Sequence, residues 1–259
     1  MGLYYECGAG LMPAYFARAD FNMDVYLFSS GPSLRNVDFS IFDNAPIYKV
    51  GINTTYPKFK PDLWIGMDFP RCFNDDLWSE PIPKITRRPF ALKTVAKSNI
   101  PVKDFPMVYF ADVDKDFTKN PALEVFRRRA HQVKFIWTNN TLTTSLHILV
   151  WMGVKRIHLL GSDFGGSEDY FDDSVSARPF NHDQDSPAGS ISDAQRKKNR
   201  TLYSQQIRFL KKFCEEGQKI GLDVISCTKS SPVNSFLQYL EPSVAVKNSI
   251  NKVSSKLKS

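Results

Sequence analysis

Six short apolar segments, each stopping at a polar residue or a glycine, constrain the fold of this chain more than any other feature. They lie at residues 23–29, 47–51, 63–67, 107–111, 156–161 and 222–226. All are rich in aliphatic, β-branched or aromatic residues and bounded by turn-forming residues, a pattern typical of buried strands. Polar side chains end or follow several of them, namely Ser30, Ser33, Asn53, Asp68 and Asp163.

Helical patterns alternate with these segments. Residues 143–152 form an apolar pattern that Gly153 ends, and residues 194–217 form a long basic pattern with apolar positions on one face. Continuous apolar strands that alternate with helices favour a mostly parallel sheet with helices on both faces. We therefore predict a single Rossmann-like α/β domain over residues 1–245 and a basic C-terminal tail at 246–259. Ligands bind such sheets at the carboxyl ends of the strands.

The charge is unevenly distributed along the chain. The formal net charge is +7, and residues 84–103 hold six cations and no acid. Residues 193–219 hold eight cations against three acids, and the tail adds four lysines. Such clusters suit a polyanion such as nucleic acid, or an anionic membrane surface, although solvated helix faces are an equal interpretation.

The remaining composition narrows the class of protein. The four cysteines are scattered without C-x-x-C spacing, which indicates buried thiols rather than a disulfide framework or a zinc site. No apolar run approaches the roughly 20 residues that a membrane-spanning helix needs, and the N-terminus lacks the pattern of a signal peptide. We expect a cytoplasmic protein without a transmembrane segment, in the host cell if a phage encodes it.

The turn after the first predicted strand has features of an anion-binding site. Ser29, Ser30, Gly31, Pro32 and Ser33 lie between that strand and a helix predicted over residues 34–42. Glycine permits close backbone approach, and a serine can cap the helix whose free amides would face an anion. The turn is neither a Walker A loop nor a dinucleotide fingerprint, and a plain helix cap is the alternative interpretation.

Several motifs in order resemble a known family. The segments VYLFSSGPSLRNVDFS, GINTTY, the strand ending at Asp68 and MGVKRIHLLGSDF resemble the bacterial sialyltransferases of glycosyltransferase family 42. They also resemble the related archaeal hydroxymethylpterin diphosphokinase-like proteins. The resemblance covers about residues 23–70 and 137–240. It implies a GT-A-type variant of the Rossmann-like fold and transfer from a nucleotide-sugar donor without a required metal.

The same resemblance implies roles for individual residues. The turn and the two strand ends beside it would hold the nucleotide, Asp163 would lie by its ribose or base, and Tyr170 would lie near the donor phosphate. The residues implied in donor binding are Ser29, Ser30, Gly31, Ser33, Asn53, Asp68, Thr141, Ser162 and Tyr170. Ser30 and Asp68 stand where the sialyltransferases have asparagine, which favours a donor other than a CMP-sugar.

The catalytic base is the least defined part of the site. His182 lies in the corresponding loop without the family's local motif, and a histidine titrates near neutral pH as a base should. Asp163 and Asp183 are further catalytic candidates, together with Asp169, Asp172 and Asp173. His147 and His158 lie within an apolar helix and strand, which indicates core positions.

A second constellation allows a metal. Asp112-Val113-Asp114 follows a predicted strand, as the D-x-D of metal-dependent sugar transferases does, and carboxylates suit Mg²⁺ or Mn²⁺. An ordinary charged turn is the alternative interpretation.

The leading prediction is a glycosyltransferase whose acceptor is a glycan or a hydroxymethylated DNA base, as in phage-like DNA modification. The rivals are a Mg²⁺-dependent pyrophosphoryl transferase acting on a pterin and a catalytically inactive nucleotide- or DNA-binding module. The oligomeric state is left open.

Overall fold

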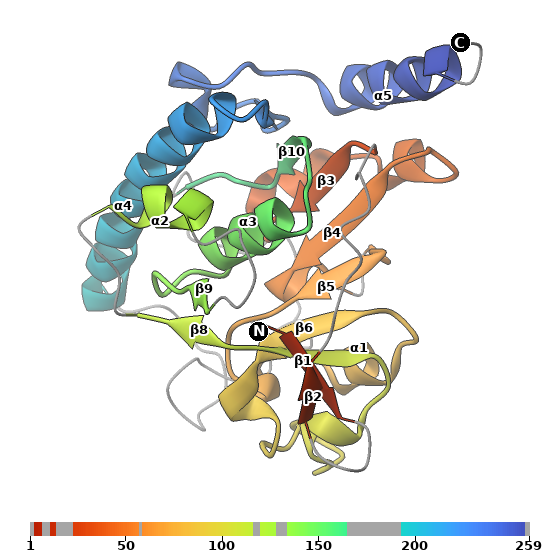
Figure 1. Ribbon diagram of the computed structural model, residues 1–259, viewed down its shortest axis with the longest axis vertical. Coiled ribbons are helices and arrows are strands. Elements are labelled where there is room, and N and C mark those ends of the chain that lie inside the picture. Colours follow the sequence, from red (N-terminus) through yellow and green to blue (C-terminus); the bar gives the residue numbers. More distant parts are fainter. Residues whose placement is uncertain are drawn as a thin grey trace.

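The computed structural model describes residues 3–6, 11–13, 23–56, 59–115, 120–127, 134–164 and 193–256. In these ranges nine strands form one sheet in the order β11-β10-β3-β4-β5-β6-β7-β1-β2, and β8 and β9 pair separately (Figure 1). The strands of the large sheet are β1 (Leu3–Glu6), β2 (Leu11–Pro13), β3 (Val25–Phe28), β4 (Tyr48–Ile52), β5 (Leu63–Ile65), β6 (Lys84–Arg87), β7 (Val108–Ala111), β10 (Arg156–Leu160) and β11 (Asp223–Ser226). The small pair is β8 (Val113–Asp114) and β9 (Phe135–Ile136).

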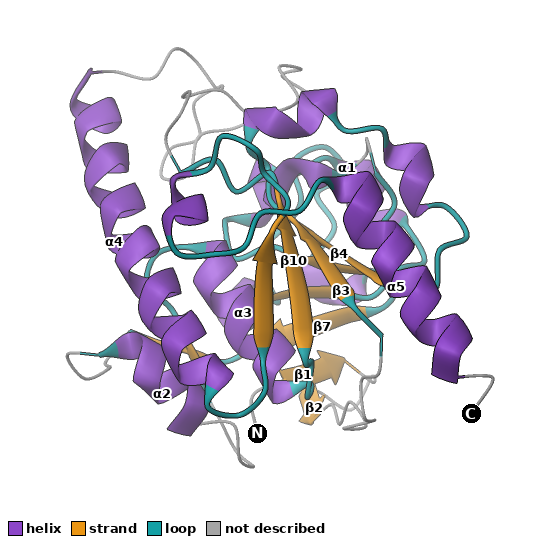
Figure 2. Cartoon of the chain, turned by 90° about the horizontal axis from the view of Figure 1, so that it is seen from above, coloured by secondary structure: helices purple, strands orange, loops and turns teal. Residues whose placement is uncertain are grey.

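The sheet is parallel from β11 to β7, and only β1 and β2 run antiparallel. The helices are α1 (Asp75–Ser79), α2 (Pro121–Arg127), α3 (Thr141–Trp151), α4 (Asp193–Gln218) and α5 (Pro242–Lys256). In Figure 2, α4 and α5 lie on opposite sides of the strands. The predicted mostly parallel α/β fold with helices on both faces is confirmed.

Alternation along β3 explains why both faces of the sheet are covered. Val25 and Leu27 belong to the apolar cluster that contains α3 and α4, whereas Tyr26 and Phe28 belong to the cluster that contains α5. All four side chains are fully buried. A strand whose side chains are apolar on both faces must be covered on both, because successive side chains point to opposite faces.

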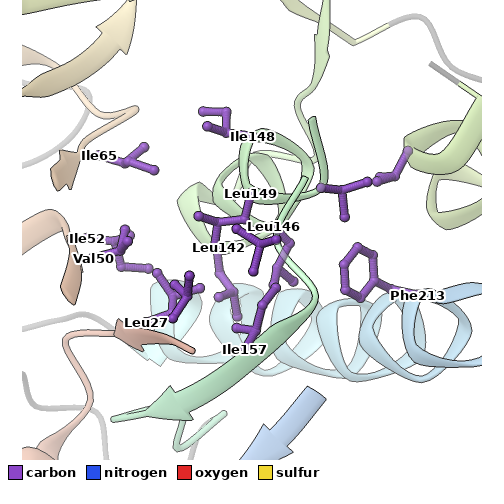
Figure 3. Close-up of a cluster of buried hydrophobic side chains, with 14 of the residues drawn as sticks. Leu27, Val50, Ile52, Ile65, Leu142, Leu146, Ile148, Leu149, Ile157 and Phe213 are labelled. Atoms are coloured by element: carbon purple, nitrogen blue, oxygen red, sulfur yellow. The ribbon is translucent and has the colours of Figure 1, made fainter. Parts of the chain in front are cut away.

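Helix α3 is buried between the sheet and α4. Leu142, Leu146 and Leu149 lie between the strand residues and Phe213 of α4 (Figure 3). All three leucines are buried, as is Phe213. Every residue from Thr141 to Val150 is buried, because other elements enclose this helix on all sides.

The prediction of one helix over residues 34–42 is wrong. Two short 3₁₀ helices, Pro32–Asn36 and Phe39–Phe42, take its place. Between them Val37 is extended, and the carboxylate of Asp38 accepts the backbone amide of Ser40. Asn and Asp side chains that bond nearby backbone compete with a continuous helix, so the chain breaks there.

Three strands of the large sheet have no counterpart in the sequence prediction. Strand β6 begins with a lysine and ends with an arginine, so its apolar content is low; β1 and β2 form the antiparallel edge. The tail boundary predicted at residue 246 falls within α5, whose Ala245 and Val246 pack under the sheet cluster that contains Tyr26. In the part of the chain described, no helix combines the length and apolarity needed to cross a membrane.

Candidate functional site

The polar residues predicted at strand ends lie along the carboxyl edge of the parallel sheet. Strand β3 lies between β4, the next strand in the sequence, and β10, which comes much later. The connection after β3 runs to β4 on one side, whereas the connection after β10 runs to β11 on the other. Such a reversal of strand order is the usual position of the ligand crevice in an open α/β sheet. The loops that flank the crevice follow β3, at Ser29–Ser33, and β10, at Gly161–Asp163.

These two loops are joined by hydrogen bonds. The carboxylate oxygen Oδ2 of Asp163 accepts the Ser33 hydroxyl at 2.8 Å and the Ser33 amide at 3.3 Å. The hydroxyls of Ser29 and Ser162 share a hydrogen bond of 3.1 Å. The amide of Gly31 donates to the carbonyl of Gly161 at 3.0 Å. Five of the predicted residues thus form one connected group, although they are about 130 positions apart in sequence.

Glycine is required at residue 31 for steric reasons. The φ of Gly31 is −75°, a value that any residue adopts. A Cβ atom there would collide with the Asp163 carboxylate and with the Gly161 carbonyl oxygen. Gly161 itself has a φ of +66°, where L side chains are strained. The two glycines allow the loops to approach closely enough for the bonds between Ser33 and Asp163.

The backbone amide of Ser33, which the sequence analysis expected to be free for an anion, already donates a hydrogen bond within the protein. Asp163 accepts it, and the Pro32–Asn36 3₁₀ helix has only five residues, too few for a helix-dipole site. An incoming phosphate would have to compete with a carboxylate for that amide. A role for Ser33 in donor binding stays a prediction, as do the roles of Ser29, Ser30, Gly31 and Ser162.

Asn53 follows β4 directly and has an unusual environment. Its φ is +53°, and its carbonyl oxygen accepts the indole Nε1 of Trp64 at 2.8 Å. Its side-chain Oδ1 is buried and has no hydrogen-bond partner, as are the hydroxyls of Thr54 and Thr55. Buried polar atoms without partners are costly and often mark a place that a ligand or water completes.

Arg87 ends β6 and was not singled out by the sequence analysis. Its guanidinium carbon lies 4.2 Å from the ring centre of Phe90 and 5.2 Å from that of Trp137. Its Nε is buried without a partner. Burial lowers the pKa of Arg87, and the negative charge of Asp68, which follows β5, partly opposes this. The cation-rich segment 84–103 was the available signal, but the strand that places Arg87 at the edge was not recognised.

The positions of Thr141 and Ser162 are set by hydrogen bonds of other residues around them. Thr141 is buried at the first residue of α3, which the Asn140 side chain caps by accepting the Thr143 amide at 3.3 Å. Ser162 donates its amide to the Thr228 hydroxyl, and its carbonyl accepts the Ser231 hydroxyl at 2.6 Å. The position of the β10 loop is therefore set by the segment after β11 as well as by β3.

The catalytic candidates in the long loop are outside the described residues. This applies to Tyr170, His182 and Asp183, and also to Asp169, Asp172 and Asp173. The two predicted core histidines, His147 and His158, are buried. Their burial confirms the core assignment.

Both aspartates of the D-x-D segment already make contacts within the protein. Asp112 pairs with Arg88 at 3.3 Å, and Asp114 lies in β8, where its carbonyl accepts the Trp137 amide. Among the described residues, no three His, Cys, Asp or Glu side chains are grouped closely enough to hold a metal ion.

Comparisons with known proteins give little further identification. No family model matches the chain, and no curated protein matches its sequence. A similar solved structure is that of the sialyltransferase CstII from Campylobacter jejuni in complex with the substrate analogue CMP-3FNeuAc. Sequence identity is 14%, the TM-score is 0.44, and the match covers 89% of this chain and 99% of that chain. Similarity at this level does not by itself identify an activity.

Proposed function

We propose that this chain is a glycosyltransferase that binds a nucleotide-sugar donor across the carboxyl edge of its sheet. The observation that carries the proposal is the pair of joined loops at the strand-order reversal, with the unpartnered Asn53 amide oxygen one strand away. A nucleoside presents hydroxyl and amino donors that such an oxygen can accept. The motif order that resembles family 42 transferases leads to the same residues.

The proposed roles follow the order of the strands. Asp163 and the serines at β3 and β10 would bind the nucleoside, Asn53 would accept a donor from its base or ribose, and Thr141 would approach the phosphate. Asp68, after β5, lies further along the edge. Hydroxyls and amides can stabilise the charge that develops on a leaving nucleotide. The proposal requires neither Mg²⁺ nor Mn²⁺, although either ion could assist the transfer.

We further propose that the base is His182 or Asp183. Both belong to residues 165–192, which follow the β10 loop in the chain. Their substitution by alanine should abolish transfer while nucleotide binding persists. Loss of binding together with transfer would assign them to the donor site instead.

A ligand panel tests the proposal. CMP, UDP, GDP and ATP, and the corresponding nucleotide sugars, are titrated with and without Mg²⁺ while the melting temperature is recorded, because a ligand that binds only the folded state raises it. We expect one nucleotide family to stabilise the protein. ATP that stabilises only with Mg²⁺ would favour pyrophosphoryl transfer, and the absence of any shift would overturn the proposal in favour of a binding module.

A matched pair of variants localises the binding. Asn53 and Asn44 both have left-handed backbone, with φ of 53° and 57°, but Asn44 is exposed after the Phe39–Phe42 helix. Asn53→Ala and Asn44→Ala therefore carry similar backbone strain, of about 1 kcal/mol. Only Asn53→Ala should weaken nucleotide binding, by about tenfold for one lost hydrogen bond in a buried site.

The acceptor is proposed to be a glycan or a hydroxymethylated DNA base. Exposed cations on α4, Arg208 and Lys211 among them, would suit a phosphate backbone. Affinity for duplex DNA measured at several salt concentrations separates the two. A steep decrease of affinity with salt favours DNA, and transfer to an oligosaccharide without DNA binding favours the glycan.

A further inference from the structure

Arg87 is a half-buried cation at the edge of the sheet, and among the described residues it forms no ion pair. The negative charge of Asp68 acts on it, but its buried Nε makes no hydrogen bond. The neighbouring Arg88, in contrast, pairs with Asp112 at 3.3 Å. The charge of Asp68 offsets only part of the desolvation cost of this half-buried arginine, because burial still lowers the pKa of Arg87.

Two aromatic rings determine how this guanidinium can be used. Phe90 lies 4.2 Å from the guanidinium carbon, and Trp137, which is 6% exposed, lies 5.2 Å from it. Aromatic rings stack on guanidinium groups through their faces, whereas the N–H groups point outward in the guanidinium plane. The rings restrict the side chain, so a bound anion would meet a fork of donors that is already oriented.

Arg87 lies on the same edge of the sheet as the crevice, three strands away from β3. Strand β6 is the third strand from β3, through β4 and β5. With neighbouring strands about 4.8 Å apart, Arg87 lies roughly 14 Å along the edge from the β3 loop. A donor whose nucleoside occupies the β3 and β10 loops would extend its other end towards β6.

We propose that Arg87 is an oxyanion-binding residue, which takes a carboxylate or a phosphate of the transferred sugar or of the acceptor by its guanidinium fork. The planar fork matches both groups by paired N–H···O bonds. This inference rests on the proposed function for the identity of the substrate, but the anion site itself does not.

A fluorescence titration tests the site. Trp137 covers the guanidinium, while Trp64 and Trp78 are fully buried elsewhere. The fourth tryptophan, Trp151 at the end of α3, is removed by Trp151→Phe, so that Trp137 reports binding. The probes are inorganic phosphate and glucuronate, with glucose as the uncharged control. We expect saturable changes with at least one anion and none with glucose. Tighter binding of glucuronate would indicate a carboxylate on a sugar, and tighter binding of phosphate would indicate a phosphoryl group.

Matched variants assign the response. Arg87→Met should weaken anion binding by about tenfold or more, whereas Arg88→Met, next in sequence and already paired with Asp112, should not. Arg87→Lys keeps the charge but not the fork and should lie between them. Unfolding midpoints are recorded for each variant, and Arg87→Lys decides if Arg87→Met does not fold. Wild-type affinity in a folded Arg87 variant, or no saturable response in the wild type, would overturn the site.

Nucleotide titrations in parallel separate this inference from the proposed function. If a nucleotide binds but substitution of Arg87 changes no anion affinity, the site is wrong and the transferase remains. If Arg87 binds anions but no nucleotide stabilises the protein, the site remains and the transferase is wrong.

Discussion

The carboxylate of Asp163 accepts both the hydroxyl and the amide of Ser33, at 2.8 and 3.3 Å. This contact joins the loop after β10 to the loop after β3 at the point where the strand order reverses. It is built from a residue expected to bind ribose and one expected to bind an anion. The geometry of the crevice therefore depends on a bond between two candidate ligand-binding residues.

Gly31→Ala should destabilise the protein and separate these loops. The added Cβ would collide with the Asp163 carboxylate and with the backbone carbonyl of Gly161, which cannot rotate away. We expect a loss of about 1–3 kcal/mol in the free energy of unfolding, measured with urea. Ser30→Ala, at a half-buried neighbouring side chain, is the control and should change it by less than about 0.5 kcal/mol. Equal stabilities for the two variants would contradict the steric argument.

Asp163→Asn should weaken the contact with Ser33 while preserving shape. The neutral amide accepts more weakly than a carboxylate, so the free energy of unfolding should fall by about 1 kcal/mol. Nucleotide affinity, measured by calorimetry, should also fall if the carboxylate binds ribose. Asp223→Asn, at an exposed ion pair with Arg156, is the control and should leave nucleotide affinity unchanged. An unchanged affinity in Asp163→Asn would remove Asp163 from the donor site.

The contacts of Asp24 should make the free energy of unfolding depend on pH in the acidic range. Burial alone would raise the pKa of Asp24. The His158 ring, whose Nε2 lies 3.6 Å from Oδ2, and hydrogen bonds from Lys252 and Ser249 outweigh burial and hold the pKa well below its ordinary value. The unfolded chain then takes up a proton that the folded state excludes. Stability from this group is complete above about pH 5 and is lost progressively as the pH falls through the ordinary pKa of about 3.9 towards the lowered pKa of the folded state.

Asp24→Asn isolates that contribution. The substitution should cost about 2–3 kcal/mol at pH 7, because α5 loses the carboxylate that Lys252 contacts at 2.7 Å. Urea unfolding at pH 7, 5 and 3 should show a smaller loss with acid in the variant than in the wild type. Parallel curves would show that the group does not act as described.

Lys84 should make stability depend on pH in the alkaline range, with the same sign as Asp24. Its side chain is fully buried, donates to the carbonyls of Glu80 and Ile82, and burial lowers its pKa to about 8. Above pH 8 the folded lysine releases its proton while the unfolded one keeps it, so this group adds stability as the pH rises towards 10. From pH 7 to 10, the free energy of unfolding of the wild type should rise by about 1–3 kcal/mol relative to that of Lys84→Met. A constant difference would contradict the lowered pKa.

The buried thiols should be unreactive in the folded protein. Burial raises the pKa of Cys227 to about 12 and that of Cys214 to about 12, and Cys72 is also buried. Cys227 lies 3.9 Å from His158, whose other ring nitrogen is 3.6 Å from Asp24, but a thiol in this state is not a nucleophile.

A thiol-reagent assay checks this state. In a Cys7→Ser background, an Ellman-type reagent at pH 8 should detect no fast-reacting thiol until denaturant is added, when the remaining three cysteines should react. A fast-reacting thiol in the native protein would show that at least one of them is accessible. Cys227→Ser should fold and retain any transferase activity.

The fold class and the strands that carry the crevice could be predicted from local sequence patterns alone. Strands such as β3 are apolar at every position, and a local pattern of that kind is sufficient to indicate a strand that helices cover on both faces. The same patterns also placed Ser33, Asn53 and Asp163 at strand ends, where a parallel sheet must bring them to one edge.

Local patterns could not predict which of these side chains contact one another and which already have a hydrogen-bond partner in the folded protein. The bond between Ser33 and Asp163 joins residues 130 positions apart, and local sequence holds no information on such a distance. The same holds for Arg87, whose strand begins and ends with a cation and is stabilised by pairing with β5 and β7 rather than by its own apolar pattern. Local propensity is read along the chain, whereas partners, burial and charge compensation are set by neighbours that the fold supplies.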